Sequence, residues 1–510
     1  MPQAPVLIAG AGPTGMVLAL ALVRRGVGVR IVDPQPGPAQ QSRAMAVHAR
    51  TLEFYRQFGW ADAVIAGGVC ARSAHLRRLG SKGERVEAAK LDLTDMGAGL
   101  SPYPFVLTYP QDDHERFLAA RLADLGVAVE WGVALKGFDQ DADGVRAVLE
   151  GPGGAHEDVQ ALYLAGCDGL HSQARQGLGI GFSGGAYDQR FFVADVRIEG
   201  GFDSDLYFNL GAHGLMLMMP VRSSGMQRLI GLLPPALSDR QHVSFDDIRP
   251  EAERLVGVKV AEVNWFSAYR VHHRVAEHFA QGRVFLAGDA GHVHSPVGGQ
   301  GMNTGIGDAF NLAWKLADVV RGRAPASLLD SYEPERIAFA RALVSTTDRA
   351  FRTMIDPGLA GELARKVVAP AMAGLVGHLP LARQTAFRLV SQIEIRYPDS
   401  PLSEGEAGVR GGDRLPWAPF AGGDNFAPLA SLDWQVHAYG PAPDDDLAAT
   451  CGRLGLALHR FAFDEAAERA GFQDGAAYLA RPDGYVALAS PGADAAELEA
   501  YARRLGLSLG

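Results

Sequence analysis

The chain has 510 residues, of which 47% are hydrophobic and 21% charged, and its mean hydropathy is close to zero. This composition is typical of a globular protein and excludes fibrous, collagenous and disordered chains, while the length indicates about three domains. The 48 basic and 58 acidic residues give a formal net charge of −10. The overall field therefore repels phosphate backbones and anionic membranes, which argues against nucleic-acid and membrane partners.

The first predicted elements surround a glycine-rich turn. A buried strand over 6–9 leads into Gly10-Ala11-Gly12-Pro13-Thr14-Gly15, and a helix over 16–25 follows. In such a turn the first glycine permits the bend, the second lets a pyrophosphate approach, and the third lets helix and strand pack closely. A second strand, 27–32, ends at Asp33, whose carboxylate would accept a ribose hydroxyl and repel a 2′-phosphate. The pattern predicts a dinucleotide site that favours FAD or NAD over NADP.

A second polar segment follows a strand predicted over 161–166. It reads Gly166-Cys167-Asp168-Gly169, with Ser172 and Arg175 close behind. Asp168 has two interpretations that the residues alone do not separate. It caps the turn, with Arg175 paired locally, or it takes part in cofactor binding.

Residues 179–278 lack such turns and alternate like strands, for example over 191–196, 206–209 and 215–219. Residues 210–214 separate the last two of these strands like a hairpin turn. We therefore predict an inserted, mainly antiparallel sheet. Its methionine and aromatic residues are more often core than ligand wall, and the sequence does not say which face of the sheet points inward.

A third glycine-rich segment follows a buried strand over 284–287. Gly288-Asp289-Ala290 closes the strand, and Pro296-Val297-Gly298-Gly299-Gln300-Gly301-Met302-Asn303 precedes a helix over 304–321. A main chain without side chains lets a flat ring approach its N–H groups, and a helix N-terminus stabilises negative charge on a reduced flavin. His292 and His294 lack a third ligand at useful spacing, so we predict no metal site.

The rest of the chain is a helical region to about residue 391, a connector rich in Pro, Gly and Ser, and a final α/β segment. In that segment strands are predicted over 434–439, 456–463 and 485–488, and a helix over 494–505. Its single cysteine, Cys451, excludes a dithiol redox role, and we hypothesise packing or dimer contact instead. The chain has only two other cysteines, Cys70 and Cys167, without disulfide or metal spacing, which indicates a reducing, cytoplasmic environment.

Several of these motifs together resemble the single-component (class A) FAD-dependent aromatic hydroxylases of the p-hydroxybenzoate hydroxylase fold. Gly288-Asp289 with the run 296–303 is similar to the family's GD motif, and Gly166–Arg175 to its DG motif. Ser42-Arg43-Ala44, residues 48–53 and Tyr109-Pro110-Gln111 also match family segments, in the expected order. Residues 412–416 and 481–485 resemble the thioredoxin-like appendage of the phenol hydroxylase and polyketide hydroxylase branches.

The resemblance implies an α/β fold in which a Rossmann-like FAD-binding domain, 1–178 and 279–395, is interrupted by an antiparallel substrate domain, 179–278. A linker over 396–415 would lead to a thioredoxin-like domain without CxxC over 416–510.

The same resemblance implies how FAD would be held. The residues expected to contact the ADP half are Gly10, Gly12, Pro13, Thr14, Gly15 and Asp33. Arg43 and Gln111 would contact the phosphate or ribityl region, and Asp289 the ribityl chain. Asp168 would interact with FAD or the pyridine nucleotide. The residues expected to border the isoalloxazine ring are Pro296, Gly299, Gly301, Met302 and Asn303.

The implied reaction is hydroxylation of a phenolic or polyketide-like ring by O2 through a flavin C4a-hydroperoxide, with NADH or NADPH as reductant. Pro296 and His213 are the catalytic candidates, the histidine being chosen as a base from residue chemistry alone. Phe208, Met216 and Met218 are candidate substrate neighbours. Two alternatives stay open: an FAD-dependent reductase or dehydrogenase without oxygen insertion, and a non-catalytic FAD-binding redox sensor. A homodimer is compatible with either class.

Overall fold

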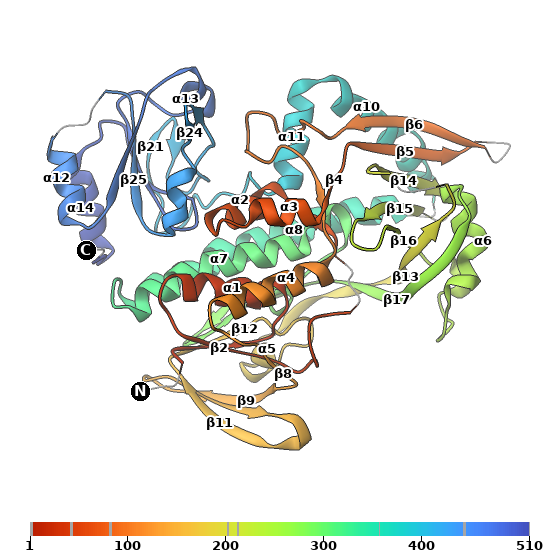
Figure 1. The fold of residues 1–510 in the computed structure, drawn as a ribbon, viewed down its shortest axis with the longest axis horizontal. Coiled ribbons are helices and arrows are strands. Elements are labelled where there is room, and N and C mark those ends of the chain that lie inside the picture. Colours follow the sequence, from red (N-terminus) through yellow and green to blue (C-terminus); the bar gives the residue numbers. More distant parts are fainter. Residues whose placement is uncertain are drawn as a thin grey trace.

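The computed structural model describes residues 4–40, 44–80, 84–200, 203–211, 214–355, 358–441 and 445–508. The predicted site residues Arg43 and His213 lie outside these ranges. The described chain forms a central α/β unit, a large sheet beside it and a separate C-terminal unit, which is blue in Figure 1. No helix of the described ranges is long and apolar enough to cross a membrane.

A six-stranded sheet lies at the centre of the molecule, in the order β18-β19-β12-β1-β2-β8. Its strands are β1 (Val6–Ala9), β2 (Val29–Asp33), β8 (Glu130–Trp131), β12 (Tyr163–Gly166), β18 (Ala280–Gln281) and β19 (Val284–Leu286). All neighbours pair in parallel except β18 with β19. Every residue of β1, β12 and β19 is buried, as expected for parallel strands that are covered on both faces.

Helices cover one face of this sheet, and a small sheet together with the short helix α5 (Gln173–Gly177) covers the other (Figure 1). The helices of the central unit are α1 (Pro13–Arg24), α2 (Ala49–Gln57), α3 (Ala61–Gly67), α4 (Gln111–Asp124), α5 (Gln173–Gly177), α7 (Gly301–Val320) and α8 (Tyr332–Ile355). The small antiparallel sheet consists of β9 (Ala134–Gln140), β10 (Val145–Glu150) and β11 (His156–Ala161). The predicted strand, turn, helix and strand at the N-terminus are confirmed, with the helix starting earlier, at Pro13.

The inserted sheet has eight strands in the order β20-β17-β13-β16-β15-β14-β5-β6. They are β5 (Ser73–Leu79), β6 (Arg85–Asp92), β13 (Phe182–Ile198), β14 (Leu206–Gly211), β15 (Gly214–Val221), β16 (Met226–Leu232), β17 (Val260–Ala276) and β20 (His292–Val293). The predicted pairing of 206–209 with 215–219 is confirmed, because β14 and β15 are antiparallel. Sequence analysis did not predict that β5 and β6, more than 100 residues earlier than β14, extend this sheet. The helix α6 (Phe245–Val256) packs on one of its faces.

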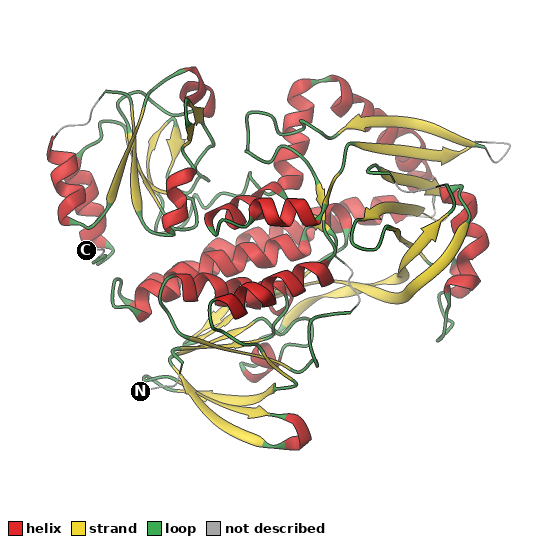
Figure 2. Cartoon of the chain, in the orientation of Figure 1, coloured by secondary structure: helices red, strands yellow, loops and turns green. Residues whose placement is uncertain are grey.

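The predicted helical region after α8 is confirmed by α9 (Leu359–Leu363), α10 (Ala369–His378) and α11 (Pro380–Ser391), shown in red in Figure 2. A further sheet, β22-β21-β28-β27-β25-β26, forms the C-terminal unit. Its elements are β21 (Glu404–Ala407), β22 (Val409–Arg410), β25 (Gln435–Tyr439), α12 (Asp445–Arg453), β26 (Ala457–Phe461), α13 (Glu465–Ala470), β27 (Ala477–Ala480), β28 (Val486–Ser490) and α14 (Ala495–Arg504). The strands and the terminal helix predicted here are confirmed to within a few residues.

Candidate active site

The three glycines of the N-terminal turn have different surroundings. Gly10 has a φ of +101°, and a β-carbon there would lie 2.2 Å from the carbonyl oxygen of Cys167. A β-carbon on Gly15 would lie 1.9 Å from the carbonyl oxygen of Gly10, so both positions must be glycine for the chain to pack. Gly12, by contrast, has no atom within 4 Å of its β-carbon position among the described residues. This open space lies at the N-terminus of α1, where main-chain N–H groups face an anion, so the turn fits a pyrophosphate.

Asp33 is held beside this turn at the end of β2. Its Oδ2 accepts a 2.7 Å hydrogen bond from the N–H of Ala11, and its Oδ1 accepts a 2.8 Å bond from the N–H of Gln35. Each carboxylate oxygen has a second lone pair, so a ribose hydroxyl can donate to Asp33 without displacing either bond.

Thr14 joins the N-terminal turn to the third glycine-rich segment. β-carbons on Gly288 and Gly305 would lie 2.6 Å and 2.3 Å from its Oγ1. The turns after β1 and β19 therefore meet at the carboxyl end of the sheet, where ligands of open α/β sheets bind. Asp289, next to Gly288, is exposed at this edge.

Asn303 fixes the shape of the loop that precedes α7. Its Nδ2 donates to the carbonyl oxygens of Ala46 and Gly299, each at 2.9 Å. Its Oδ1 accepts from the N–H of His48 at 2.9 Å and from Oγ1 of Thr51 at 2.8 Å. The side chain is buried, and both its amide nitrogen and its amide oxygen make their hydrogen bonds within the protein. It therefore holds the loop, while Pro296 on the same loop is exposed and Gly301 and Met302 are partly exposed.

His48, at the start of α2, supports the same loop from the side. Its Nε2 lies 2.8 Å from the carbonyl oxygen of Gly298 and must donate to it, because a carbonyl cannot. Burial lowers the pKa of His48 from 6.5 to about 4, despite these backbone contacts. The ring is thus a neutral donor near pH 7.

Asp168 caps α5, as one of its two interpretations expects. Its Oδ2 accepts hydrogen bonds from the N–H groups of Gln173 and Ala174, at 2.7 and 3.1 Å. Its Oδ1 is buried and has no hydrogen-bond partner among the described residues, so an acceptor is left for a ligand. Arg175 donates one local bond, to the carbonyl oxygen of Leu170, and one distant bond, to the carbonyl oxygen of Ala290 beyond β19.

Gln111 starts α4, where its side chain donates a 2.8 Å bond to Glu115. The other carboxylate oxygen of Glu115 accepts the N–H of Ala39, and burial raises the pKa of this carboxyl. Gln111 is thereby tied to the chain segment that leads to position 43.

The inserted sheet separates the three predicted substrate neighbours. Phe208 is opposite Leu217 on β15, which is opposite Ile230 on β16, and these three side chains are partly exposed beside the core of the central unit. Met216 and Met218 are buried on the other face, packed with α6. Met216 also lines a shallow cleft between the sheet and α6, and none of the residues that line this cleft belongs to the glycine loops.

Asp308 on α7 is a site residue that sequence analysis missed. Its Oδ2 accepts the N–H of Gly288 at 2.9 Å and lies 2.7 Å from Nε2 of His292, and its Oδ1 accepts Nε of Arg336 at 2.6 Å. The available signal in the sequence was an aspartate within a helix that is otherwise rich in apolar residues. His292 is thus bonded to a carboxylate, and within the described ranges no group of three or more His, Cys, Asp or Glu side chains could hold a metal.

Comparison with known proteins now identifies the class. A family model described as an FAD binding domain matches residues 3–347. The chain is 40% identical over 420 residues to 6-methylpretetramide 4-monooxygenase of Streptomyces rimosus, covering 80% of this chain and 73% of that protein. It is 35% identical over 417 residues to dialkyldecalin synthase of Streptomyces rugosporus, covering 79% and 84%. A solved ternary complex of aklavinone-11 hydroxylase with FAD and aklavinone has a TM-score of 0.79 and 27% identity, covering 99% of each chain.

The fold and these matches define a flavoprotein monooxygenase of the single-component aromatic hydroxylase class, with FAD as its cofactor. The chain belongs to the FAD binding domain family. The resemblance drawn from the GD and DG motifs is therefore confirmed.

Gly12→Ala and Gly15→Ala should separate cofactor binding from folding. Because the space at Gly12 is open, we expect Gly12→Ala to change the stability of the FAD-free protein by less than about 0.5 kcal/mol while weakening FAD binding at least tenfold. Gly15→Ala should destabilise the FAD-free protein itself. Denaturation of the apoprotein and fluorescence titration with FAD measure the two effects. Equal FAD affinity in wild type and Gly12→Ala would show that the pyrophosphate lies elsewhere.

His48 should make the fold sensitive to acid. Above pH 6.5 it is neutral in both the folded and unfolded states, whereas between pH 6.5 and 4 only the unfolded chain binds the proton. The free energy of unfolding should then fall as the pH falls, by up to about 1.4 kcal/mol per pH unit for this one group. His48→Gln keeps a side-chain donor and should flatten the curve in that window. An unchanged slope in denaturation curves from pH 7 to 4 would contradict this assignment.

Proposed function

We propose that this monooxygenase hydroxylates an aromatic ring of a polyketide-like substrate, with NADH or NADPH as reductant and O2 as the oxygen donor. The observation that carries the proposal is the partly exposed apolar row Phe208, Leu217 and Ile230, which packs against the same core as Met302 of the ring-binding loop. The 40% identity to 6-methylpretetramide 4-monooxygenase and the full-length likeness to aklavinone-11 hydroxylase support a large ring system over a simple phenol.

FAD supplies the redox and oxygen-activating chemistry when bound, and the chain holds and shields it. The N–H groups of Gly12, Thr14 and Gly15 would face the pyrophosphate, and Asp33 the adenosine ribose. Asp289 would bind the ribityl chain, with Gln111 and Arg43 at the phosphate or ribityl region. Asp168 would offer its free Oδ1 to FAD or the pyridine nucleotide.

The ring of FAD would lie against the loop before α7. Pro296, Gly299, Gly301 and Met302 would border it, and Asn303 would act by holding the loop rather than by touching the ring. The N-terminus of α7 points at this loop and would stabilise negative charge on the reduced ring. His213 stays our candidate for the catalytic base. Pro296 stays our candidate for the residue that lies nearest the reacting edge of the flavin ring.

The substrate would lie on the face of the sheet that carries Phe208. A ligand on one face of a sheet cannot contact side chains of the other, so Leu217 and Ile230 replace Met216 and Met218 in our assignment. The two methionines instead belong to the core under α6.

We further propose that the C-terminal unit is a thioredoxin-like domain without redox function. Its order β25-α12-β26-α13-β27-β28-α14, with β25 parallel to β26 and antiparallel to β27, supports this. Cys451 is buried in its core, in favour of the packing role.

The division of the chain at 178, 278 and 395 and a cytoplasmic location also stay proposals, the latter supported by three free cysteines. We place the start of the C-terminal unit before the boundary expected at 415, because β21 and β22 belong to its sheet. In a homodimer, the surface buried between the two copies would include α10. This helix is apolar, all its residues are described and none of them is buried.

The reaction is tested with purified, FAD-loaded protein and a panel of phenols and polycyclic aromatic polyketides. We expect substrate to stimulate NADH or NADPH oxidation and the product to gain one 18O atom from 18O2. The isotope is needed because one relative, 35% identical, is named for a synthase reaction. Oxidation without 18O in any product would favour the reductase alternative, and FAD binding with neither activity the redox sensor.

Phe208→Ala and Met218→Ala test which face of the sheet meets the substrate. Phe208→Ala should raise KM at least tenfold while FAD binding is unchanged, because a partly exposed wall residue is removed. Met218→Ala should cost about 2–5 kcal/mol of stability, as for a buried methionine, and leave the KM of the folded enzyme within about twofold. The reverse pattern in steady-state kinetics and thermal unfolding would place the substrate on the α6 face.

A further inference from the structure

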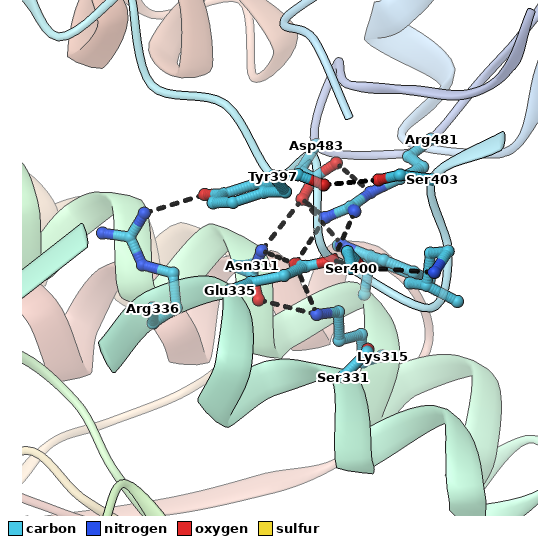
Figure 3. A network of polar contacts seen from close by, with 12 residues as sticks. Asn311, Lys315, Ser331, Glu335, Arg336, Tyr397, Ser400, Ser403, Arg481 and Asp483 are labelled. Atoms are coloured by element: carbon cyan, nitrogen blue, oxygen red, sulfur yellow. Dashed lines mark hydrogen bonds and ion pairs between the residues drawn. The ribbon is translucent and has the colours of Figure 1, made fainter. Parts of the chain in front are cut away.

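A buried carboxylate on α8 joins the C-terminal unit to the FAD-binding unit (Figure 3). Glu335 accepts two hydrogen bonds from Arg481, at 2.7 and 3.0 Å, and one from Lys315, at 2.7 Å. Asn311 and Ser400 each donate a further bond of 2.6 Å. Burial alone would raise the pKa of Glu335, but the cations Arg481 and Lys315 outweigh it and hold that pKa far below its usual range.

Arg481 is itself fixed by residues of both units. Its guanidinium donates to both carboxylate oxygens of Asp483, at 3.0 and 2.6 Å. Asp483 also accepts a 3.0 Å bond from the indole N–H of Trp314 on α7. Arg481, Glu335 and Lys315 have no solvent exposure, so each charge in this group depends on its partners.

A second buried carboxylate, Glu53 on α2, repeats this arrangement. Arg414 of the C-terminal unit donates two bonds to it, at 2.9 and 2.7 Å, and Arg50 one of 2.9 Å. Arg50 in turn donates a 2.6 Å bond to the carbonyl oxygen of Asp483. Burial would raise the pKa of Glu53, but Arg414 and Arg50 lower it to about 2.

The helix α8 is linked to the turn at Gly288 through Asp308 of α7. Arg336, the residue after Glu335, donates to Asp308, which accepts the N–H of Gly288. The same guanidinium donates a 2.8 Å bond to the hydroxyl of Tyr397 in the connector. The position of Gly288 therefore depends, through Asp308, on Arg336 of α8. The residue before Arg336 is Glu335, which is bonded to Arg481 of the C-terminal unit.

The helix α2 is bonded to the loop that precedes α7, here called the ring-side loop. Its N-terminal turn contains Thr51, which donates to Asn303, and is preceded by His48, which donates to Gly298. Glu53 lies two residues beyond Thr51 and receives Arg414. The ring-side loop is thus bonded directly to α2, and the Gly288 turn is linked to α8 through Asp308 of α7. Each of these two helices carries a buried glutamate that accepts two hydrogen bonds from an arginine of the C-terminal unit.

We infer that Arg414 and Arg481 are positioning residues for the flavin: by neutralising Glu53 and Glu335 they hold α2 and α8, and through them both flavin-binding loops, in the geometry that binds the cofactor. The inference rests on the flavin lying at these loops, as proposed above. It gives the C-terminal unit a role in cofactor binding that requires no contact between its residues and the flavin.

Full-length Arg481→Met and Arg414→Met test the inference, with Arg323→Met as matched control. Arg323 also joins the two units, donating 3.0 and 2.7 Å bonds to Asp433, but it lies beyond the end of α7 and contacts neither loop. FAD affinity is measured by fluorescence titration of the apoproteins, together with flavin absorption spectra and the melting temperatures of apo- and FAD-loaded protein.

We expect the FAD dissociation constant to rise at least tenfold in Arg481→Met and Arg414→Met, with an altered flavin spectrum and a smaller rise in melting temperature on FAD binding. Arg323→Met should lower the melting temperature and leave FAD affinity within twofold of wild type. Lower melting temperatures in all three variants with unchanged FAD affinity would overturn the inference, because the contacts would then only stabilise the fold.

If a methionine variant does not fold, Arg481→Lys and Arg414→Lys keep the charge and lose the two-pronged geometry, and they must show an intermediate loss of FAD affinity. Wild-type FAD affinity in both lysine variants would also overturn the inference. Failure of wild type to bind FAD would instead refute the proposed function, so the two failures are distinguishable.

Discussion

Contact of main chain with main chain at the carboxyl ends of β1, β12 and β19 is the constraint on which the cofactor site depends. Gly10 lies against the carbonyl of Cys167, and Gly15 against Gly10, at separations that leave no room for a β-carbon. Thr14 fills the space beside Gly288. Three segments far apart in the sequence meet here with few side chains between them, and so their free N–H groups and strand-end carboxylates face one edge. The site for an anionic dinucleotide is thus a property of the fold.

A main chain brought this close needs support from polar groups inside the core, and such groups are stable there only when they are fully bonded. Asn303 and Asp308 supply that support. Each of them forms hydrogen bonds both to the main chain of a loop and to a neighbouring helix. Asp308 is paired with Arg336 of α8, and the preceding residue of α8, Glu335, is paired with Lys315 and Arg481. Buried carboxylates on this helix therefore need buried cations, and one of them comes from the C-terminal unit.

The sequence could predict the parts of the site whose physics is local. The glycine turns, the strand-end carboxylates and the helices that follow them are read from neighbouring residues, and those elements were found as predicted. Asp308 could not be assigned, since its partners Gly288 and Arg336 are distant in the chain. The two strands at 73–92 were missed for the same reason. Alternation showed that Met216 and Met218 share a face, but a period of two cannot say which face is inward.

The packing of α6 decides which face of the inserted sheet is buried and which is left for a substrate. The apolar side of α6 covers Met216 and Met218, and the opposite row, which includes Phe208 and Leu217, is left partly exposed beside the core of the central unit. A slip of one residue in β15 would exchange the two sets, placing methionines where leucine now lies. The packing of α6 therefore determines which side chains a substrate can meet. Residues that never contact the ligand set its surroundings here, just as buried charges remote from the flavin set the position of its loops.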